Sequence, residues 1–382
     1  MRKTVPLLLI IHLLVFACSQ KVGGKSPQPE DVFLPEGDRV RVAVWVESLE
    51  IPWSLVFLPD GRALVSERPG RIRLIQEGKL RETSYAEIDA AHTGEAGLMG
   101  LAIHPDFPRK PYIYAMHTFR KDGGLYNKVV RLKDKGERGD IDRIVFDGIP
   151  GARLHDGGRI AFGPDGMLYI TTGENFKADF AQDLSSPAGK ILRITPEGEI
   201  PSDNPFRGSP VYSYGHRNPQ GIAWHPRTGK LFASEHGPSG EFGRFGYDEI
   251  NIIVKGGNYG WPRTAGGPGE KPYVDPILVW KKTTPPSGIA FYRGNLFPHM
   301  KGDLFVSTLR GRALIRIRLD RAAGRVERIE RWFASDHETG TYGRLRDVVE
   351  GPDGALYFLT NNRDGRGNPR PGDDKIYRIV PK

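Results

Sequence analysis

The chain repeats one local pattern, a turn sequence that is often Pro-Asp-Gly followed by a short run of alternating apolar and polar residues. Alternation with a period of two is typical of a β-strand with one buried face, and Asp-Gly favours the tight turn of a hairpin. A second strand-like run follows several of these units and could pair with its predecessor in an antiparallel sheet. The first pattern occurs at 58–66, 104–115, 163–171, 225–233, 302–307 and 351–359, and the second at 70–75, 189–194, 313–318 and 375–380.

About six such units predict an all-β fold, a six-bladed β-propeller with four-stranded antiparallel blades. A pair of β-sandwiches is the alternative, but the same unit recurs along the whole chain, which favours a ring of similar blades. The 48 Gly and 31 Pro residues are spread throughout, which suits many short strands joined by turns. No stretch shows sustained helical periodicity, so we expect residues 39–382 to form a single propeller domain.

The first residues predict that the protein is exported. Met1-Arg-Lys-Thr4 is basic, and the apolar run from Val5 to Ala17 that follows it is short for a membrane span. This combination is typical of a secretory signal, so residues 1–18 are expected to be a signal peptide, with a transmembrane anchor as the alternative. The expected location is periplasmic or otherwise outside the cytoplasm.

Cys18 is the only cysteine in the sequence, so the mature domain has no internal disulfide. Val15-Phe-Ala-Cys18 resembles a bacterial lipobox, in which Cys18 would carry a lipid anchor to the membrane, although Phe16 is atypical at its position. Residues 19–38 are rich in Ser, Lys, Gly, Pro and Gln, a composition typical of a flexible tether.

The formal net charge of +9 could indicate a nucleic-acid partner. The basic residues are scattered, however, without an arginine-rich helix or a clustered run, and the predicted export argues against such a partner. We therefore expect no nucleic-acid partner. A binding site for an acidic small molecule would use the same residues locally.

Candidate functional residues lie on the predicted loops between strands, because the loops at one end of a propeller channel converge. Arg217 can bind a carboxylate with its forked guanidinium, and the Asn218 amide lies beside it. Gly237 and Pro238 lie in a tight turn that could direct their carbonyls to a hard cation. A turn-rich loop with a surface arginine is the alternative for this stretch. The full set is Glu95, His155, Glu174, Arg217, Asn218, Gly237, Pro238, Arg310, Arg344 and Arg346.

An ordered set of motifs resembles the soluble quinoprotein glucose/aldose sugar dehydrogenase family over roughly residues 40–381. Each motif alone is weak, but their order together is specific. They lie at 94–107, 155–159, 215–221, 235–238, 248–253, 256–262, 309–311 and 344–347. The resemblance implies a six-bladed propeller that carries pyrroloquinoline quinone (PQQ) and calcium and oxidises aldose sugars at the anomeric carbon to lactones. The short chain is closer to the broad-specificity aldose sugar branch.

The resemblance also implies roles for the catalytic residues. His155 corresponds to the general base, which would take the proton of the anomeric hydroxyl while hydride passes to the quinone. Glu174 stands where the family has an Asp that supports this His, one methylene longer, so its reach to His155 is open. Arg217 is expected to act at the reaction centre as well as in cofactor binding.

The remaining residues are assigned to the cofactor and the metal by the same resemblance. Arg217, Asn218, Arg310, Arg344 and Arg346 correspond to groups that surround the three PQQ carboxylates, and Gly237 and Pro238 to the carbonyl ligands of calcium. Arg310 replaces the Lys of glucose-specific members. Glu95 replaces their Gln and is grouped with the cofactor-binding residues, where it would raise the pKa of His155 or contact the sugar.

Several questions stay open at this stage. A non-catalytic propeller that binds a glycan or a protein, and a calcium-dependent lactonase, are the alternative functions. Glu241, Asp248 and Glu249 could hold a further calcium ion or lie in solvated acidic turns. A dehydrogenase of this kind needs an electron acceptor, expected to be a respiratory-chain carrier or a quinone.

Overall fold

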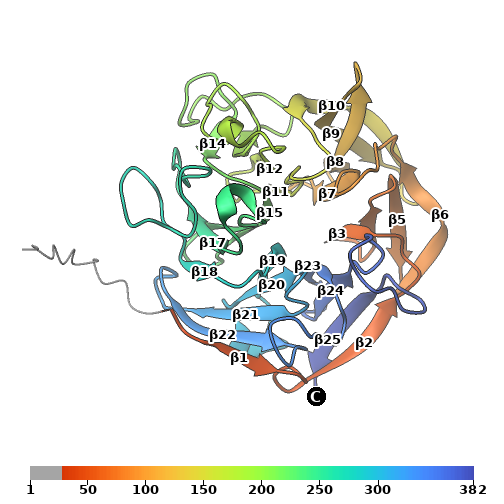
Figure 1. The fold of residues 1–382 in the computed structure, drawn as a ribbon. Helices are drawn as coiled ribbons and strands as arrows, with labels where there is room; N and C mark the ends of the chain where they lie inside the picture. Colours follow the sequence, from red (N-terminus) through yellow and green to blue (C-terminus); the bar gives the residue numbers. More distant parts are fainter. Residues whose placement is uncertain (1–27) are drawn as a thin grey trace, which may run out of the picture.

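The computed structural model describes residues 28–382, in which almost all regular structure is β-strand. Six sheets stand side by side around a central axis and form a closed ring (Figure 1). The predicted fold, a six-bladed β-propeller with four-stranded antiparallel blades, is therefore confirmed. The predicted signal peptide and Cys18 lie outside the described residues. Within residues 28–382, no helix has the length and apolar character needed to span a bilayer.

Four strands that follow one another in the chain build each blade, except that β2 (Val40–Val46) completes the last blade. The first three blades contain β3 (Pro52–Phe57), β4 (Ala63–Glu67), β5 (Arg71–Gln76) and β6 (Lys79–Glu87); β7 (Leu98–Ile103), β8 (Tyr112–Lys121), β9 (Gly124–Asp134) and β10 (Gly139–Pro150); and β11 (Ile160–Phe162), β12 (Leu168–Thr172), β13 (Lys190–Ile194) and β14 (Val211–Tyr214).

The last three blades contain β15 (Pro219–Trp224), β16 (Leu231–Glu235), β17 (Asp248–Ile253) and β18 (Leu278–Trp280); β19 (Pro286–Phe291), β20 (Leu304–Thr308), β21 (Leu314–Leu319) and β22 (Val326–Trp332); and β23 (Leu345–Glu350), β24 (Leu356–Thr360), β25 (Ile376–Pro381) and β2 (Val40–Val46). Short 3-10 turns occur at Ala178–Ala181, Glu241–Gly243 and Pro298–Met300. The first strand of each blade lies innermost, and the ring closes because β2 pairs antiparallel with β25.

The middle strands differ from the sequence expectation. Alternating residues predicted strands with one buried face, but every residue of β4, β12, β16, β20 and β24 is buried. The reason is that both faces of a blade pack against neighbouring blades. Leu168 and Leu192, for example, share a core cluster with Met116 and Val129 of the preceding blade. The polar positions of these strands, such as Ser66, are buried as well and form hydrogen bonds between blades.

The segment before the ring corrects one prediction. A tether was expected over residues 19–38, but β1 (Asp31–Leu34) pairs parallel with β22 and adds a fifth strand to that blade. Phe33 and Leu34 pack against the hydrophobic core, and Asp31 forms an ion pair with Arg331 at 2.6 Å. The Pro- and Gly-rich composition of the surrounding residues concealed these four positions.

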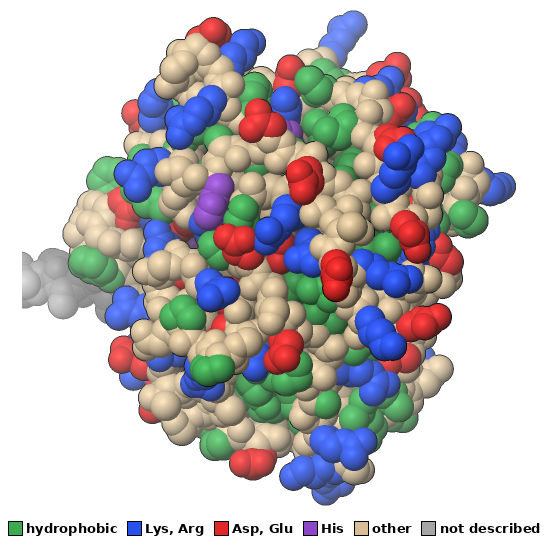
Figure 2. All heavy atoms as spheres, turned by 90° about the vertical axis from the view of Figure 1, so that its right-hand side faces the viewer, with side chains coloured by type: hydrophobic (Ala, Val, Ile, Leu, Met, Phe, Trp, Pro, Cys, Tyr) green, Lys and Arg blue, Asp and Glu red, His purple; other side chains and the backbone are tan. Residues whose placement is uncertain are grey.

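Acidic and basic side chains alternate over the side of the ring seen in Figure 2. Many charged side chains of the described chain form ion pairs, including Arg62 with Asp134 at 2.8 Å and Arg131 with Asp142 at 2.5 Å. The excess positive charge is therefore not concentrated into a field of one sign on this side of the molecule.

Because neighbouring strands in a blade are antiparallel, successive loops lie at alternate ends of the channel. The Pro-Asp-Gly turns connect the first and second strands of the blades, as between β11 and β12, and they lie at one end of the channel. The loops between second and third strands, and those from one blade to the next, then lie at the other end. The candidate residues occur in this second group of loops or at the adjoining strand ends.

Candidate functional site

All ten predicted residues occur at the same end of the propeller, although they are spread over more than two hundred positions of the sequence. Loops that lead from one blade to the next carry Glu95, His155, Arg217, Asn218 and Arg344, while Arg346 lies at the start of β23. Loops between the second and third strands carry Glu174, Gly237, Pro238 and Arg310.

His155 is the centre of the first group of contacts. Its Nδ1 lies 2.5 Å from Oε1 of Glu174, and both side chains are buried. The imidazole stacks on Phe176 with 4.2 Å between ring centroids, and Phe176 is itself 55% exposed. A carboxylate on Nδ1 holds the proton there and leaves Nε2 as the acceptor. The side chain of Glu174 therefore does reach His155.

The backbone around this pair is unusual. His155 and Phe176 have positive φ angles of 62° and 59°, values that are uncommon for residues with side chains and often mark functional sites. Gly173 has no space for a side chain, because a Cβ there would lie 1.8 Å from the carbonyl oxygen of His155. This glycine permits the close approach that brings Glu174 to the imidazole.

Glu95 contacts the same loop from the neighbouring blade. Its Oε2 accepts a hydrogen bond from the backbone N–H of His155 at 3.3 Å, and its Oε1 accepts one from Arg366 at 2.5 Å. Burial opposes ionisation of Glu95, but the positive charge of Arg366 lowers its pKa to about 2. Glu95 is thus an ionised carboxylate that fixes the backbone of His155.

Asp156, the residue after His155, holds the loop in place through two hydrogen bonds. It is buried, and its Oδ1 accepts hydrogen bonds from Asn127 Nδ2 at 2.9 Å and from the backbone N–H of Ala152 at 3.0 Å. Its Oδ2 has no partner among the described residues. Burial raises the pKa of Asp156 to about 7, although the two hydrogen bonds act in the opposite direction.

Arg217 and Asn218 lie beside this loop. The backbone N–H of Gly157 donates to Oδ1 of Asn218 at 3.0 Å, which joins the two neighbouring loops. The Arg217 guanidinium forms an ion pair with Glu241 and lies 5.5 Å from the ring centre of Trp261. Its backbone N–H donates to the carboxylate of Glu235. Arg217 is therefore held by two acidic residues from the loop and strand that follow it.

Arg344 and Arg346 have different surroundings. Arg344 is paired with Asp364, whose Oδ2 lies 2.7 Å from Nη2. Arg346 is completely enclosed and donates only to neutral groups, among them Gln220 at 2.7 Å and Asn361 at 3.1 Å. Burial lowers the pKa of Arg346 to about 9. A buried guanidinium without a carboxylate is costly unless a ligand supplies the negative charge.

His236, which the sequence reasoning did not select, belongs to the same group. Its backbone N–H donates to the Asn218 carbonyl at 3.3 Å, and its own carbonyl accepts from Arg217 at 3.4 Å. Burial lowers the pKa of His236 to about 3; the charge of Glu95 opposes this shift, whereas Arg217 and Arg346 add to it. The imidazole is therefore neutral and lies among these charged residues.

Several buried donors in this region have no acceptor among the described residues. They are the Nε atoms of Arg68, Arg217 and Arg346, Nδ2 of Asn218 and Nε1 of Trp261. Buried polar atoms are normally hydrogen-bonded, and unpaired ones call for an explanation. A group of unpaired donors that includes three guanidinium groups fits an anionic ligand with several acceptor oxygens.

Gly237 and Pro238 line a small hollow together with Arg217, His236 and Trp261. The backbone N–H of Gly237 donates to Asp248 at 3.0 Å, and the carbonyl of Pro238 accepts from Gly246 at 3.1 Å. Carbonyl oxygens are ligands that suit calcium. Within residues 28–382, no three His, Cys, Asp or Glu side chains are placed to hold a metal ion, so a cation here would depend on backbone carbonyls and on a ligand.

Two of the three acidic residues near this turn, Asp248 and Glu249, are not in solvated turns, contrary to one of the two expectations. Asp248 and Glu249 lie on β17 and are buried, because β17 packs inside its blade. Burial raises the pKa of Asp248 to about 6 and that of Glu249 to about 8, the latter with a contribution from the charge of Glu235. Glu241 is partly exposed and paired with Arg217.

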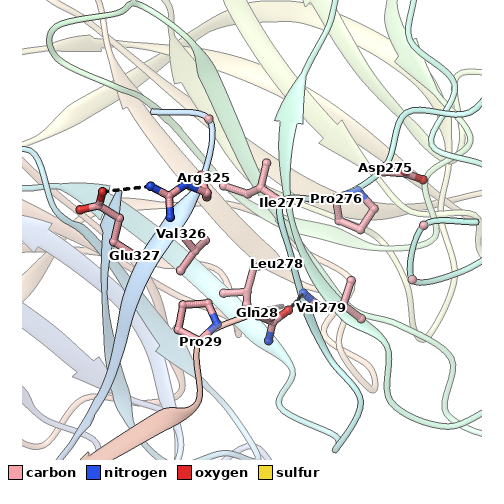
Figure 3. Close-up of a pocket in the computed structure, with 13 residues that line it drawn as sticks. Gln28, Pro29, Asp275, Pro276, Ile277, Leu278, Val279, Arg325, Val326 and Glu327 are labelled. Atoms are coloured by element: carbon pink, nitrogen blue, oxygen red, sulfur yellow. Dashed lines mark hydrogen bonds and ion pairs between the residues drawn. The ribbon is translucent and has the colours of Figure 1, made fainter. Parts of the chain in front are cut away.

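Arg310 is the predicted residue that the contacts do not join to the others. Its side chain is exposed and lines a surface hollow with Lys281, Lys282 and His337. Another hollow, at the rim between β18 and β22 (Figure 3), contains none of the ten predicted residues.

The structure adds residues that sequence reasoning missed, chiefly Arg68, Phe176, His236, Trp261 and Arg366. His236 and Trp261 belong to the motifs at 235–238 and 256–262, and this membership could have identified them as site residues. Arg68 and Arg366 occur in ordinary turn sequences, and only the ring brings them to Glu95 and Arg346.

The fold and contacts define a six-bladed propeller in which buried cations lie beside a His–Glu pair. The chain matches the family model described as glucose/sorbosone dehydrogenase over residues 49–377. This protein belongs to the glucose/sorbosone dehydrogenase family.

Individual relatives extend this result. A putative oxidoreductase (glucose dehydrogenase) of Thermus thermophilus has a similar structure, with 55% sequence identity, a TM-score of 0.81, and 89% of this chain and 100% of that chain covered. The PQQ-bound aldose sugar dehydrogenase of Streptomyces coelicolor has 39% identity and a TM-score of 0.77, over 89% and 98% of the two chains. The aldose sugar dehydrogenase YliI of Escherichia coli is 35% identical over 351 residues, which are 85% of this chain and 91% of that protein.

The carboxyl of Asp156 should make stability depend on pH. Its pKa is about 7 in the folded protein, above the ordinary value of 3.8, so its contribution to stability is fully present below about pH 4 and is lost as the pH rises to about 7. Asp156→Asn keeps an oxygen that can accept the two hydrogen bonds but removes the ionisable group. We expect urea unfolding of this variant to show a smaller loss of stability between pH 4 and 7 than the wild type. If the free energy of unfolding changed equally with pH in Asp156→Asn and in the wild type, Asp156 would not be the group that titrates. The control is Asp147→Asn, in an exposed position of β10.

Proposed function

We propose that the protein is a PQQ- and calcium-dependent dehydrogenase that oxidises aldose sugars at the anomeric carbon to lactones. The observation that carries this proposal is the group of buried, unpaired donors beside His155, which fits the three carboxylates of PQQ. Family membership and the names of the relatives support the same reaction class.

The proposed cofactor contacts follow from charge and burial. Arg346 and Arg217 would bind PQQ carboxylates, and Asn218 Nδ2 would donate a further hydrogen bond. Arg344 and Arg310 would add positive charge at the edge of the site, Arg344 while paired with Asp364. The carbonyls of Gly237 and Pro238 would hold calcium against the cofactor.

His155 would act as the general base of the reaction. Its Nε2 would take the proton from the anomeric hydroxyl of the sugar, while Glu174 holds the other ring proton on Nδ1 and stabilises the imidazolium that forms. PQQ, polarised by calcium, would supply the acceptor for the hydride that leaves the anomeric carbon. Glu95 would keep the His155 backbone in place and present a negative charge to the sugar.

Two alternatives are weaker on these observations. A calcium-dependent lactonase needs metal-binding side chains at the channel and gives no reason for buried arginines without acceptors. A binding propeller needs neither the His155–Glu174 pair nor the enclosed Arg346. We further propose an exported protein, lipid-anchored through Cys18, that delivers its electrons to a respiratory carrier or a quinone.

Reconstitution tests the proposal directly. The protein without cofactor would be mixed with PQQ and Ca²⁺, and the reduction of an artificial dye would be followed with a panel of aldoses. Activity that requires both additions supports the proposal. Failure to bind PQQ in calorimetry, with no dye reduction, would reject it in favour of a binding propeller.

Replacement of His155 should separate catalysis from cofactor binding. We expect His155→Ala to lower kcat by about a hundredfold to ten-thousandfold, the usual contribution of a general base, and to leave the Kd for PQQ within about threefold. His299→Ala, an exposed histidine in the 3-10 turn Pro298–Met300, is the control. A large loss of PQQ affinity in His155→Ala would show that the residue binds the cofactor instead.

Arg346 should matter mainly for cofactor affinity. Arg346→Met keeps most of the side-chain volume but removes the buried charge, so we expect the Kd for PQQ to rise by about a hundredfold. Arg378→Met, which breaks a partly exposed ion pair with Asp353 in the same blade, should leave the Kd unchanged. Equal PQQ affinity in the two variants would remove Arg346 from the site.

A further inference from the structure

The N-terminal segment from Gln28 to Leu34, here called the strap, crosses the rims of two blades. Gln28 Oε1 accepts a hydrogen bond from the backbone N–H of Val279 on β18 at 2.9 Å. Figure 3 shows Gln28 and Pro29 between β18 and the beginning of β22. The strap then continues as β1 along β22, in parallel register from Asp31 opposite Ile329 to Leu34 opposite Trp332.

Within the strap, Asp31 forms a polar contact with a buried residue of the blade. Its carboxylate accepts a hydrogen bond at 2.6 Å from Nε of Arg331, a residue of β22 that is 0% exposed. Burial lowers the pKa of Arg331, and the negative charge of Asp31 is the largest effect in the opposite direction. Asp31 thus supplies the counter-charge that allows a guanidinium inside the blade.

The Arg331 guanidinium is also connected by hydrogen bonds to the predicted metal site. Arg331 Nη2 donates to Oγ1 of Thr284 at 3.2 Å, and the backbone N–H of Thr284 donates to Oδ2 of Asp248 at 2.6 Å. The other carboxylate oxygen of Asp248 accepts from the backbone N–H of Gly237 at 3.0 Å. An unbroken series of hydrogen bonds therefore joins Asp31 to Gly237 through three buried residues.

Arg331 also supports a second loop at this end of the channel. A Cβ placed on Gly311 would lie 3.2 Å from Arg331 Nη1 and 3.1 Å from the Thr284 side chain. The Arg331 guanidinium, whose charge Asp31 balances, therefore lies against the loop of Arg310 and is linked by hydrogen bonds to the loop of Gly237. Both loops are predicted to hold the cofactor or its metal.

The geometry points to Asp31 as a positioning residue of the metal and cofactor site, and to the strap as a part of that site. Asp31 acts through Arg331, Thr284 and Asp248 on the loop of Gly237 and Pro238. Without Asp31, the buried guanidinium would turn toward Asp248, the other carboxylate whose charge acts on it, and compete with the bond that Asp248 makes to Gly237. This inference rests on the proposed function for the identity of the ligand, but the coupling itself belongs to the protein alone.

The first measurement therefore needs no cofactor. Asp31→Asn keeps the shape of the side chain and removes its charge. We expect peptides that cover residues 236–246 to exchange amide hydrogens faster in Asp31→Asn than in the wild type, whereas peptides from β8 in the second blade exchange at the same rate. Unchanged exchange at 236–246 overturns the inference, whatever the protein binds.

The second measurement is calcium-dependent PQQ binding, followed by calorimetry on the full chain. We expect Asp31→Asn to need about tenfold more free calcium than the wild type for half-maximal PQQ binding. Thr284→Val, which keeps Asp31 paired with Arg331 but removes the hydroxyl of the series, should shift the calcium requirement in the same direction. This variant tests the coupling even if Asp31→Asn fails to fold.

Asp303→Asn is the matched control. Asp303 accepts a hydrogen bond from Nε of Arg316 at 2.7 Å, and Arg316 is likewise buried in the same blade. The other hydrogen bonds of Arg316 go to Asp38, Glu330 and the His299 carbonyl and do not lead to Gly237. The control should lose stability without a change in calcium requirement. Equal shifts in Asp303→Asn and Asp31→Asn would show a general effect of stability and overturn the inference. Absence of PQQ binding in the wild type would reject the proposed function, which the exchange measurement distinguishes from failure of the coupling.

Discussion

The pairing of β2 with β25 is the constraint on which the rest of the structure depends. A ring of sheets has a free edge until its first and last blades are joined, and here residues from the beginning of the domain complete the last blade, with Val40 opposite Pro381. Closure packs β23 against β3 and completes the inner circle of strands. Because all the innermost strands then run in the same direction along the channel, loops as distant as those of Glu95 and Asp364 meet at one end.

The site that results is electrostatically incomplete in the protein alone. Arg346 is enclosed by neutral partners, and the Nε atoms of Arg68 and Arg217 are buried without acceptors in the described chain. Such groups reduce stability unless a ligand satisfies them, and functional sites are where proteins keep them. His155 and Glu174, by contrast, are already joined at 2.5 Å. The His155–Glu174 pair is thus already formed, whereas Arg346 has no carboxylate among its hydrogen-bond partners in the described chain.

Residues outside the predicted domain contribute to this arrangement. The strap places Asp31 on the buried Arg331, and the series continues through Thr284 and Asp248 to Gly237. A segment whose composition suggested a mere connection to the signal peptide is therefore packed against the blade that supports the site. Its four-residue strand is too short to be recognised without the edge of β22 on which it lies.

Sequence patterns alone predicted the number of blades and the turn that precedes each repeated strand, because these depend on local alternation and on turn chemistry. The motif residues, among them His155, Arg217, Asn218 and Arg346, came from the resemblance to a known family. Only the tertiary structure decided that Glu174 reaches His155, that Asp248 and Glu249 are buried, that Arg366 pairs with Glu95 and that Arg310 stays exposed. The reason is physical: burial and charge pairing depend on which loops the closed ring brings together, and sequence spacing does not contain that information.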